Sequence, residues 1–330
     1  YGALRPSILD ISLDPWFLVR LMISSTTLPP SVRPGDRIGV AALSGKVDPA
    51  RLATGLEALE ALGYVPVEAA NLRSCCGLFA GSDQERLDAF HDLAADDDLG
   101  AIVFARGGYG VTRILPDIDW TLLARRPRSY VGYSDLTPFL LQVVARLGIT
   151  AFHGPMVAGD FARGLTPAEQ EGFEAALAGD QPIRFPICAE DDAAAISGPV
   201  LGGCLSMLVA TLGTPYAPDL EGAILVLEDL GEPLYRFDRM LTHLRLSGNL
   251  TKLSGVVAGH LEGDDESSLA ASHETLLAQL RQEARGFPWP LAWGLPVGHS
   301  RPNLTLPLGL WGTLDPAAGE LTIGEALTRG

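Results

Sequence analysis

The fold is decided by the stretch Ala101-Ile-Val-Phe-Ala-Arg106-Gly-Gly-Tyr-Gly110, an apolar run of strand length that stops at glycines and so frees several backbone amides. A second run, Ser129-Tyr-Val-Gly-Tyr-Ser134-Asp135, ends on a hydroxyl. It continues into residues 136–147, which have helical spacing with Pro138 in the first turn. A serine at such a corner is exposed near the positive end of a helix dipole. The two runs therefore predict a nucleophile at Ser134.

The serine corner departs from one known pattern. In the nucleophile elbow G-x-S-x-G a glycine stands on both sides of the serine, but here Leu136 occupies the second glycine position after Gly132. Ser and Asp ahead of a helix are also common caps, and glycines after a strand are common turns. A catalytic corner and an ordinary helix start therefore both remain open at this point.

Length and composition indicate a compact protein of two domains. A chain of 330 residues is longer than one core usually grows, and 47% of the residues are apolar while 19% are charged. The 24 basic and 40 acidic side chains give a formal charge of −16, which argues against a nucleic acid or an anionic membrane as partner. A small anionic substrate is still allowed, because salt screens surface charge over about 8 Å and a local arginine can dominate a site.

Cysteine usage and the amino-terminal residues indicate the cytoplasm. The four cysteines stand at Cys75, Cys76, Cys188 and Cys204. They lack C-x-x-C spacing, so they predict neither a disulfide framework nor a zinc site and fit reduced thiols. Charged side chains interrupt residues 1–21, which therefore do not read as a signal peptide, and no apolar run approaches the ~20 residues that span a bilayer. We expect residues 1–30 to form a loose extension, with Met22 as a hypothetical native start.

Strands and helices alternate through the first half of the chain. Strands are expected at 37–43, 64–68, 101–105, 129–133 and 148–152, and helices at 49–62, after the capping box Ser82-Asp-Gln-Glu85, and at 136–147. This alternation predicts an α/β fold with a parallel sheet covered on both faces. Ligands of such sheets bind beyond the carboxyl ends of the strands. Arg106, Ser134 and His153 would therefore share one edge.

The pattern changes between about residue 160 and residue 195. A helix at 167–177 leads into a polar passage that contains prolines, which is the expected domain boundary. Residues 31–180 would form the α/β domain that carries the nucleophile, and residues 196–330 a smaller mixed α/β domain.

Two runs of this second domain end on chemically useful side chains. A buried strand at 222–227 ends directly on Glu228-Asp229, and a strand-like run from Leu291 to Gly298 ends on His299. The residues beyond 300 alternate apolar and polar groups with glycine turns, as an antiparallel tail would.

Three separate predicted strands thus end on Ser134, Glu228 and His299. Serine is a poor nucleophile at neutral pH, so it needs an imidazole that takes its proton and a carboxylate that holds the imidazole in one tautomer. Amides of the Gly107-Gly108 loop and of Asp135 could form an oxyanion hole. The set predicts a serine hydrolase.

Two alternatives concern the acid and the histidines. Asp229 could replace Glu228 as the orienting acid, although strand alternation turns the two in opposite directions, so that only one can face His299. A metal site built from His153, His299 and Glu228 is conceivable, because imidazole and carboxylate suit zinc, but the H-x-x-x-H spacing is missing.

At these residues the chain resembles the LD-carboxypeptidase family, serine peptidases that include muramoyltetrapeptide carboxypeptidases and microcin C self-immunity peptidases. The matching pieces are Pro34-Gly-Asp, Ala80-Gly-Ser-Asp83, Arg106-Gly-Gly-Tyr-Gly110, Gly132-Tyr-Ser-Asp135, His153-Gly-Pro155, Leu227-Glu-Asp229 and Gly298-His299. Each piece alone is weak, but the ordered set is specific. The resemblance covers roughly residues 31–325, and it implies a flavodoxin-like amino-terminal domain and a carboxy-terminal domain that completes the triad.

The resemblance also implies roles. Ser134 would be the nucleophile, Glu228 the orienting acid and His299 the general base, with backbone amides of Gly108 and Asp135 as oxyanion donors. The family is metal-free, uses no cofactor and is typically dimeric. Its cytoplasmic members remove the terminal D-alanine of a muropeptide stem.

Such a substrate carries a carboxylate that needs a cation in an acidic protein. Arg106 is our first expectation for that role and Arg301 the second, a structural ion pair being the alternative for either. His153 is expected either to line the pocket or to be a structural histidine. Two other functions stay open: a peptidase of peptide-nucleotide antibiotics, and a non-catalytic small-molecule binding protein.

Overall fold

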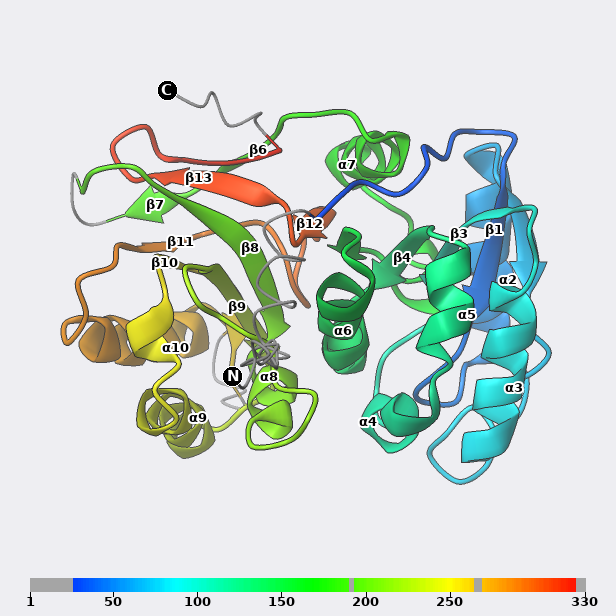
Figure 1. Cartoon of the computed structure of the whole chain (residues 1–330), viewed down its shortest axis with the longest axis horizontal. Helices are drawn as coiled ribbons and strands as arrows, with labels where there is room; N and C mark the ends of the chain where they lie inside the picture. Colours follow the sequence, from blue (N-terminus) through cyan, green and yellow to red (C-terminus); the bar gives the residue numbers. More distant parts are fainter. Residues whose placement is uncertain (1–25, 190–192, 264–268, 325–330) are drawn as a thin grey trace, which may run out of the picture.

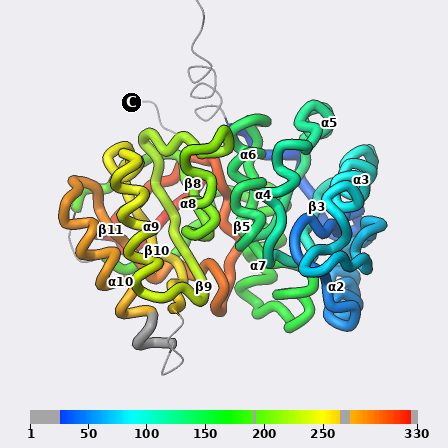
Figure 2. Tube along the Cα trace, turned by 90° about the horizontal axis from the view of Figure 1, so that it is seen from below, coloured from blue at the N-terminus to red at the C-terminus, as the bar shows by residue number. Residues whose placement is uncertain are grey.

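The computed structural model describes residues 26–189, 193–263 and 269–324, and these residues build two β-sheets that lie side by side (Figure 1). The first sheet has the strand order β12-β5-β4-β3-β1-β2, and the second the order β6-β14-β13-β8-β9-β10-β11-β7. Seen from below, the elements of the second sheet gather on one side and α2 and α3 on the other (Figure 2). The predicted α/β fold class, with a parallel first sheet and a mixed second sheet, is confirmed.

The first sheet is built from strands with buried apolar side chains. Its strands are β1 (Arg37–Ala41), β2 (Val65–Glu68), β3 (Leu99–Phe104), β4 (Ser129–Gly132) and β5 (Ala151–His153), which are parallel, and β12 (Leu306–Leu308), which runs antiparallel to β5. The apolar side chains of β3 and β4 are almost fully buried, as expected where helices cover both faces of a parallel sheet. The order 2-1-3-4-5 is the flavodoxin-like one.

The helices around this sheet begin at recognisable caps. They are α2 (Pro49–Ala61), α3 (Asp83–Ala94), α4 (Val111–Ile114), α5 (Trp120–Arg125), α6 (Thr137–Leu147) and α7 (Pro167–Ala178), with a π-helical turn at Val157–Phe161. The predicted capping box before α3 is present, because Ser82 and Glu85 each accept from the other's backbone amide. In α6 both faces are apolar and buried, since the helix packs against β4 and β5 on one side and against the second sheet on the other. Figure 1 shows α6 between the two sheets.

The second sheet combines a parallel centre with antiparallel edges. The parallel strands are β8 (Ile196–Cys204), β9 (Ile224–Leu230), β10 (Gly255–Glu262) and β11 (Leu291–Trp293), and the antiparallel ones are β6 (Ile183–Pro186), β7 (Cys188–Ala189), β13 (Trp311–Asp315) and β14 (Glu320–Ile323). The helices α8 (Leu205–Thr211), α9 (Leu234–Leu246) and α10 (Leu269–Ala284) belong to this half. No helix in the described part of the chain is both long and apolar enough to cross a bilayer.

Two segments differ from the sequence-based expectation. The passage that contains Pro182 and Pro186 is expected only as a domain boundary, but it forms β6 and β7, which lie at edges of the second sheet where a proline costs little. The tail was expected to stay with the second domain, but β12 crosses over to pair with β5 of the first sheet. The pairing of β12 with β5 therefore connects the second half of the chain to the first sheet.

The expected amino-terminal extension falls mostly outside the described residues, which begin at Thr26, so Met22 lies beyond them. Thr27, which belongs to the expected loose extension, is held by backbone hydrogen bonds. Its amide donates to the Gly148 carbonyl at 3.0 Å, and its own carbonyl accepts from the Thr150 amide at 2.9 Å. Thr27 thus pairs with the segment between the end of α6 and the start of β5.

Candidate active site

Ser134 lies at a strained corner between β4 and α6. A 3₁₀ turn, Ser134–Leu136, connects the strand to the helix. Ser134 has a φ of 62°, and among the described residues it is the one non-glycine residue with a positive φ. This left-handed conformation costs an L-residue roughly 1–2 kcal/mol. Strain of this kind persists where the surrounding structure enforces it, and it marks Ser134 as a candidate functional residue.

The glycine loop between β3 and α4 packs against this corner. A Cβ at Gly107 would lie 2.9 Å from the Ser134 Cβ and 3.1 Å from its Oγ, so the close approach requires glycine. Gly108 follows with a φ of 106° and is exposed. The Asp135 carboxylate accepts from the Val111 amide at 2.9 Å and so ties the end of the loop to the serine corner. Within the described chain no hydrogen bond occupies the Gly108 amide, which is therefore available to a ligand.

Arg86 holds the same loop from behind, and sequence reasoning missed it. Its side chain is fully buried, and its Nη1 donates to the carbonyls of Gly110, at 3.0 Å, and Leu43. Its Nη2 pairs with Asp83 at the start of α3. A lone arginine on an otherwise amphipathic helix gives no sequence signal, because the carbonyls that it binds come from two distant loops.

Glu228 and His299 form a buried hydrogen-bonded pair. Glu228 is fully buried in β9, and its Oε2 accepts from the Nδ1 of His299 at 2.7 Å. Burial lowers the pKa of His299, but the Glu228 charge outweighs it and leaves this pKa above its ordinary value. Burial likewise raises the pKa of Glu228, but the charge and hydrogen bond of His299 bring it below its usual range. With Nδ1 engaged, Nε2 is the nitrogen that can accept a proton from a substrate or a neighbour.

Asp229 has a different task. Its carboxylate accepts from the amide of Ser206, at 2.7 Å, and from its own neighbour Leu230, at 2.9 Å, so it caps the start of α8. Burial, together with the adjacent Glu228, raises the pKa of Asp229 to about 6. Strand alternation separates the two acids as expected, and it is Glu228 that faces His299.

His299 lies in a loop and not at the end of a strand, which corrects the sequence-based expectation. β11 ends at Trp293, because Gly294 has a φ of 78° and leads into a loop. Gly298 has a φ of 114°, and a Cβ there would lie 2.8 Å from Glu228 Oε2. The loop is fixed by Asn303, whose side-chain oxygen accepts from the Gly298 amide at 3.0 Å.

Asn303 and Glu169 therefore hold the loop that carries His299 through buried hydrogen bonds. Both are fully buried, and Glu169 accepts from the Asn303 amide at 2.9 Å. Glu169 also closes the capping box of α7 with Thr166. Thr166-Pro-Ala-Glu169 has capping-box spacing, but nothing in this local sequence indicates that its glutamate also reaches a loop far along the chain.

Tyr133 joins the two halves of the candidate site. Its ring lies 5.0 Å from that of His299, edge to face, and 5.4 Å from that of His153. Ser134 is its chain neighbour, so the serine corner and the Glu228–His299 pair meet at this ring. In the described chain no hydrogen bond joins Ser134 Oγ to His299. Catalytic hydrogen bonds are often long without substrate and tighten in its presence.

His153 lies behind the site. It is 1% exposed, and burial lowers its pKa to about 4, so it is neutral at physiological pH. It packs against Tyr133 and contributes to the buried wall. No three His, Cys, Asp or Glu side chains within residues 26–189, 193–263 and 269–324 are grouped so that they could hold a metal ion, so the alternative set of His153, His299 and Glu228 is not arranged as a metal centre.

The two arginines considered for substrate binding are placed differently. Arg106 lies on the glycine loop and donates from Nη1 to the Lys46 carbonyl at 3.0 Å. Arg301 lies two residues after His299 in the same loop, and its Nη2 donates to the carbonyls of Gly164 and Arg163. Both side chains are exposed, and in the described part of the chain neither forms an ion pair.

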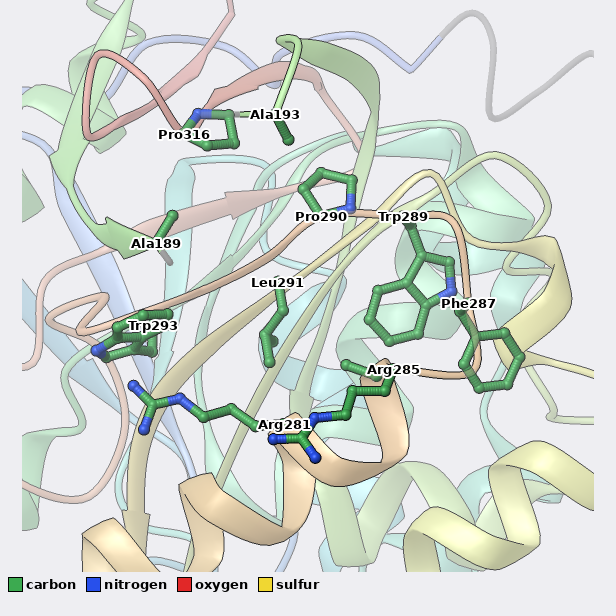
Figure 3. Close-up of a pocket in the computed structure, with 11 residues that line it drawn as sticks. Ala189, Ala193, Arg281, Arg285, Phe287, Trp289, Pro290, Leu291, Trp293 and Pro316 are labelled. Carbon is green, nitrogen blue, oxygen red and sulfur yellow. The ribbon is translucent and has the colours of Figure 1, made fainter. Parts of the chain in front are cut away.

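A separate pocket of about 180 Å³ lies at the β7–β11 edge of the second sheet, where Arg281 of α10 and Arg285, just after this helix, form one wall (Figure 3). The Arg281 guanidinium carbon lies 4.3 Å from the Trp293 ring centroid. None of the candidate site residues lines this pocket, so it is not part of the site built above.

Comparison with known proteins gives two family matches. The LD-carboxypeptidase N-terminal domain matches residues 38–154, and the LD-carboxypeptidase C-terminal domain matches residues 197–314. The first range contains the serine corner, and the second contains the Glu228–His299 pair. Both halves of the site therefore fall within matched regions.

Individual relatives match over most of the chain. The probable murein peptide carboxypeptidase of Bacillus subtilis is 30% identical over 313 residues, which are 92% of this chain and 96% of that protein. The murein tetrapeptide carboxypeptidase of Pseudomonas aeruginosa is 33% identical over 248 residues, 72% of this chain and 79% of that protein. The microcin C7 self-immunity protein MccF of Escherichia coli is 26% identical over 306 residues, 83% of this chain and 88% of that protein.

One solved structure combines likeness of fold and of sequence. The muramoyltetrapeptide carboxypeptidase from Oxalobacter formigenes superposes with a TM-score of 0.76 at 32% identity. The match covers 88% of this chain and all of that one.

Proposed function

The chain belongs to the LD-carboxypeptidase family of serine-type carboxypeptidases, and we propose that it removes the terminal D-alanine from muropeptide tetrapeptides through Ser134, His299 and Glu228. The observation that carries this proposal is the buried hydrogen bond between Glu228 and His299 at 2.7 Å. The ring of His299 also contacts that of Tyr133, the chain neighbour of the strained Ser134. The family itself implies hydrolysis of a peptide bond in murein recycling.

In the proposed reaction Ser134 Oγ attacks the scissile carbonyl while His299 Nε2 takes its proton. Glu228 holds the imidazole by Nδ1 and stabilises the imidazolium that forms. The carbonyl oxygen becomes an oxyanion that the amides of Gly108 and Asp135 stabilise, each donor being worth roughly 3 kcal/mol of barrier. His299 then gives the proton to the leaving amine of D-alanine, and a water molecule hydrolyses the acyl-enzyme by the reverse sequence.

The remaining parts of the proposal concern its setting. We propose a nucleophile domain at residues 31–180 and a second domain at residues 196–330, with the site between them. The enzyme would act in the cytoplasm as a homodimer, without a metal or cofactor, and His153 and Arg301 would support the walls of the site.

A second candidate function is cleavage of peptide-nucleotide antibiotics. Similarity to the microcin C7 self-immunity protein of E. coli over 306 residues favours it. This reaction would use the same triad and differ only in the loops that line the pocket. A non-catalytic binding protein is the third possibility, and it predicts that Ser134→Ala functions normally.

The test is incubation with a muropeptide tetrapeptide, with mass spectrometry for the loss of one alanine. An aminoacyl-adenylate analogue in a parallel reaction separates the two peptidase functions. Under the proposal Ser134→Ala lowers kcat by about a thousandfold or more, as removal of a triad member does. An unchanged rate in this variant would reject the assignment of the nucleophile.

A further inference from the structure

We propose that Arg106 and Lys46 form an anion subsite on the rim of the glycine loop, and that it binds a carboxylate of the peptide substrate. This inference rests on the proposed peptidase function and names the substrate group that the site recognises. It also decides between the two arginines that the sequence left open.

The first support is the position of the Arg106 guanidinium. A Cβ at Gly45 would lie 3.5 Å from its Nε and Cζ, and a Cβ at Gly108 would lie 3.3 Å from its Nη2. The guanidinium therefore lies against the backbone of both glycines. Gly108 carries the amide that we propose as an oxyanion donor, so Arg106 is next to the point where the scissile carbonyl would bind.

The second support is that the guanidinium is held in place without a carboxylate. Its Nη1 donates to the Lys46 carbonyl at 3.0 Å, and the Gly45 amide donates to the Gly107 carbonyl at 3.1 Å, which fixes the two loops against each other. The rest of its five N–H donors have no protein acceptor in the part of the chain that the structure describes. A positioned, exposed guanidinium of this kind matches a carboxylate in geometry and charge.

The third support is the contrast with other arginines of this acidic chain. Arg37, Arg113 and Arg163 each pair with an aspartate, at 3.1 Å, 2.7 Å and 2.7 Å. Arg106 does not do so within the described residues, although acidic side chains outnumber basic ones by 40 to 24. Lys46 adds a second exposed positive charge that is likewise without an ion pair there.

Arg301 fits the role less well. Its Nη2 is engaged by the Gly164 and Arg163 carbonyls, which join the histidine loop to the turn after the π-helical segment. Burial raises the pKa of Glu169, but hydrogen bonds from Thr166 and Asn303, with a smaller contribution from the Arg301 charge, bring this pKa below its ordinary value. Arg301 therefore supports the loop of His299, whereas Arg106 faces an open position.

The test measures kcat and KM for Arg106→Gln and Lys46→Gln on the tetrapeptide. We expect KM to rise about ten- to a hundredfold for Arg106→Gln, the size of a lost charge-assisted hydrogen bond, and less for Lys46→Gln, with kcat changed less than about threefold. Arg106→Lys should recover part of the affinity. Lys252→Gln is the matched control, because it removes an exposed charge in the other half of the chain.

Two substrate arms identify the carboxylate. If the subsite binds the terminal carboxylate, a tetrapeptide with a terminal carboxamide loses affinity for the wild type but not for Arg106→Gln. If the subsite binds the carboxylate of a diaminopimelate residue, a stem with lysine in its place loses affinity for the wild type but not for Arg106→Gln.

Other results overturn the inference. Loss of affinity in Lys252→Gln equal to that in Arg106→Gln and Lys46→Gln would contradict the subsite and leave the peptidase function intact. A wild-type chain that neither cleaves the tetrapeptide nor binds it in calorimetry would overturn both proposals together.

Discussion

The side of the site that carries Ser134 comes from one continuous run, residues 107–135, whereas the side that carries His299 joins two residues that are 71 positions apart. The serine side depends on backbone geometry: a positive φ at Ser134 and a glycine at 107 that leaves room for it. The histidine side depends on a buried charge pair. The comparison teaches that substitutions on the serine side should change rates at every pH, and those on the histidine side should also change the pH dependence.

The largest expected effect is that of Glu228→Gln, which removes the charge but keeps the shape. By analogy with other triads kcat should fall by about 10³- to 10⁴-fold, because the glutamine no longer holds the imidazole in the correct tautomer and no longer stabilises the imidazolium that forms. The activity of the wild type should rise with pH as His299 loses its proton, with a midpoint above about 6.5, since Glu228 raises this pKa. In the variant the midpoint should move to lower pH, as profiles of kcat/KM against pH would show.

Asp229→Asn is the control for this substitution. It is the same chemical change one residue along the strand, at a carboxylate that caps α8 and does not bind His299. We expect kcat to stay within about tenfold of the wild type, the range of an indirect effect. A collapse of activity in Asp229→Asn, with Glu228→Gln left active, would exchange the roles of the two acids.

A smaller effect is expected from adding one methyl group at a glycine, either beside Ser134 or beside Glu228. Gly107→Ala places a Cβ 2.9 Å from Ser134 Cβ, and Gly298→Ala places one 2.8 Å from Glu228 Oε2. Both should lower kcat by about 10²-fold, as misplacements near 1 Å do. Only Gly298→Ala should also move the pH midpoint. Equal pH profiles for the two variants would remove the distinction between the sides.

The smallest effect concerns the stored strain at the serine corner. Ser134→Gly and Ser134→Ala both remove the hydroxyl, but only glycine adopts a φ of 62° without strain. The glycine variant should therefore be more stable than the alanine variant by about 1 kcal/mol in chemical denaturation. A more stable alanine variant would show that the corner is not strained in solution.

The same contrast explains what the sequence could predict. The parallel first sheet, α6 and the place of Ser134 between a strand and a helix follow from local apolar runs and glycines, and their prediction was confirmed, whereas the role of Ser134 as nucleophile stays a prediction. The crossing of β12 into the first sheet could not be foreseen, because a three-residue strand carries no periodic signal.

Supports that arise only from tertiary contact were missed as well. Arg86 binds two distant carbonyls, and Asn303 and Glu169 meet across more than a hundred positions of chain. The run before His299 read as a strand because it is apolar, but Gly294 turns it into a loop. Strand alternation predicted that only one of Glu228 and Asp229 can face His299, and it was the resemblance to the family that indicated Glu228.

The most direct test of the account is the coupling between its two sides, measured as kcat of Ser134→Ala, His299→Gln and the double variant on the tetrapeptide. Residues that act as one unit are strongly non-additive. We predict that the double variant is no slower than Ser134→Ala by more than about threefold, the resolution of such a comparison. Losses that multiply in the double variant would contradict a shared mechanism of Ser134 and His299.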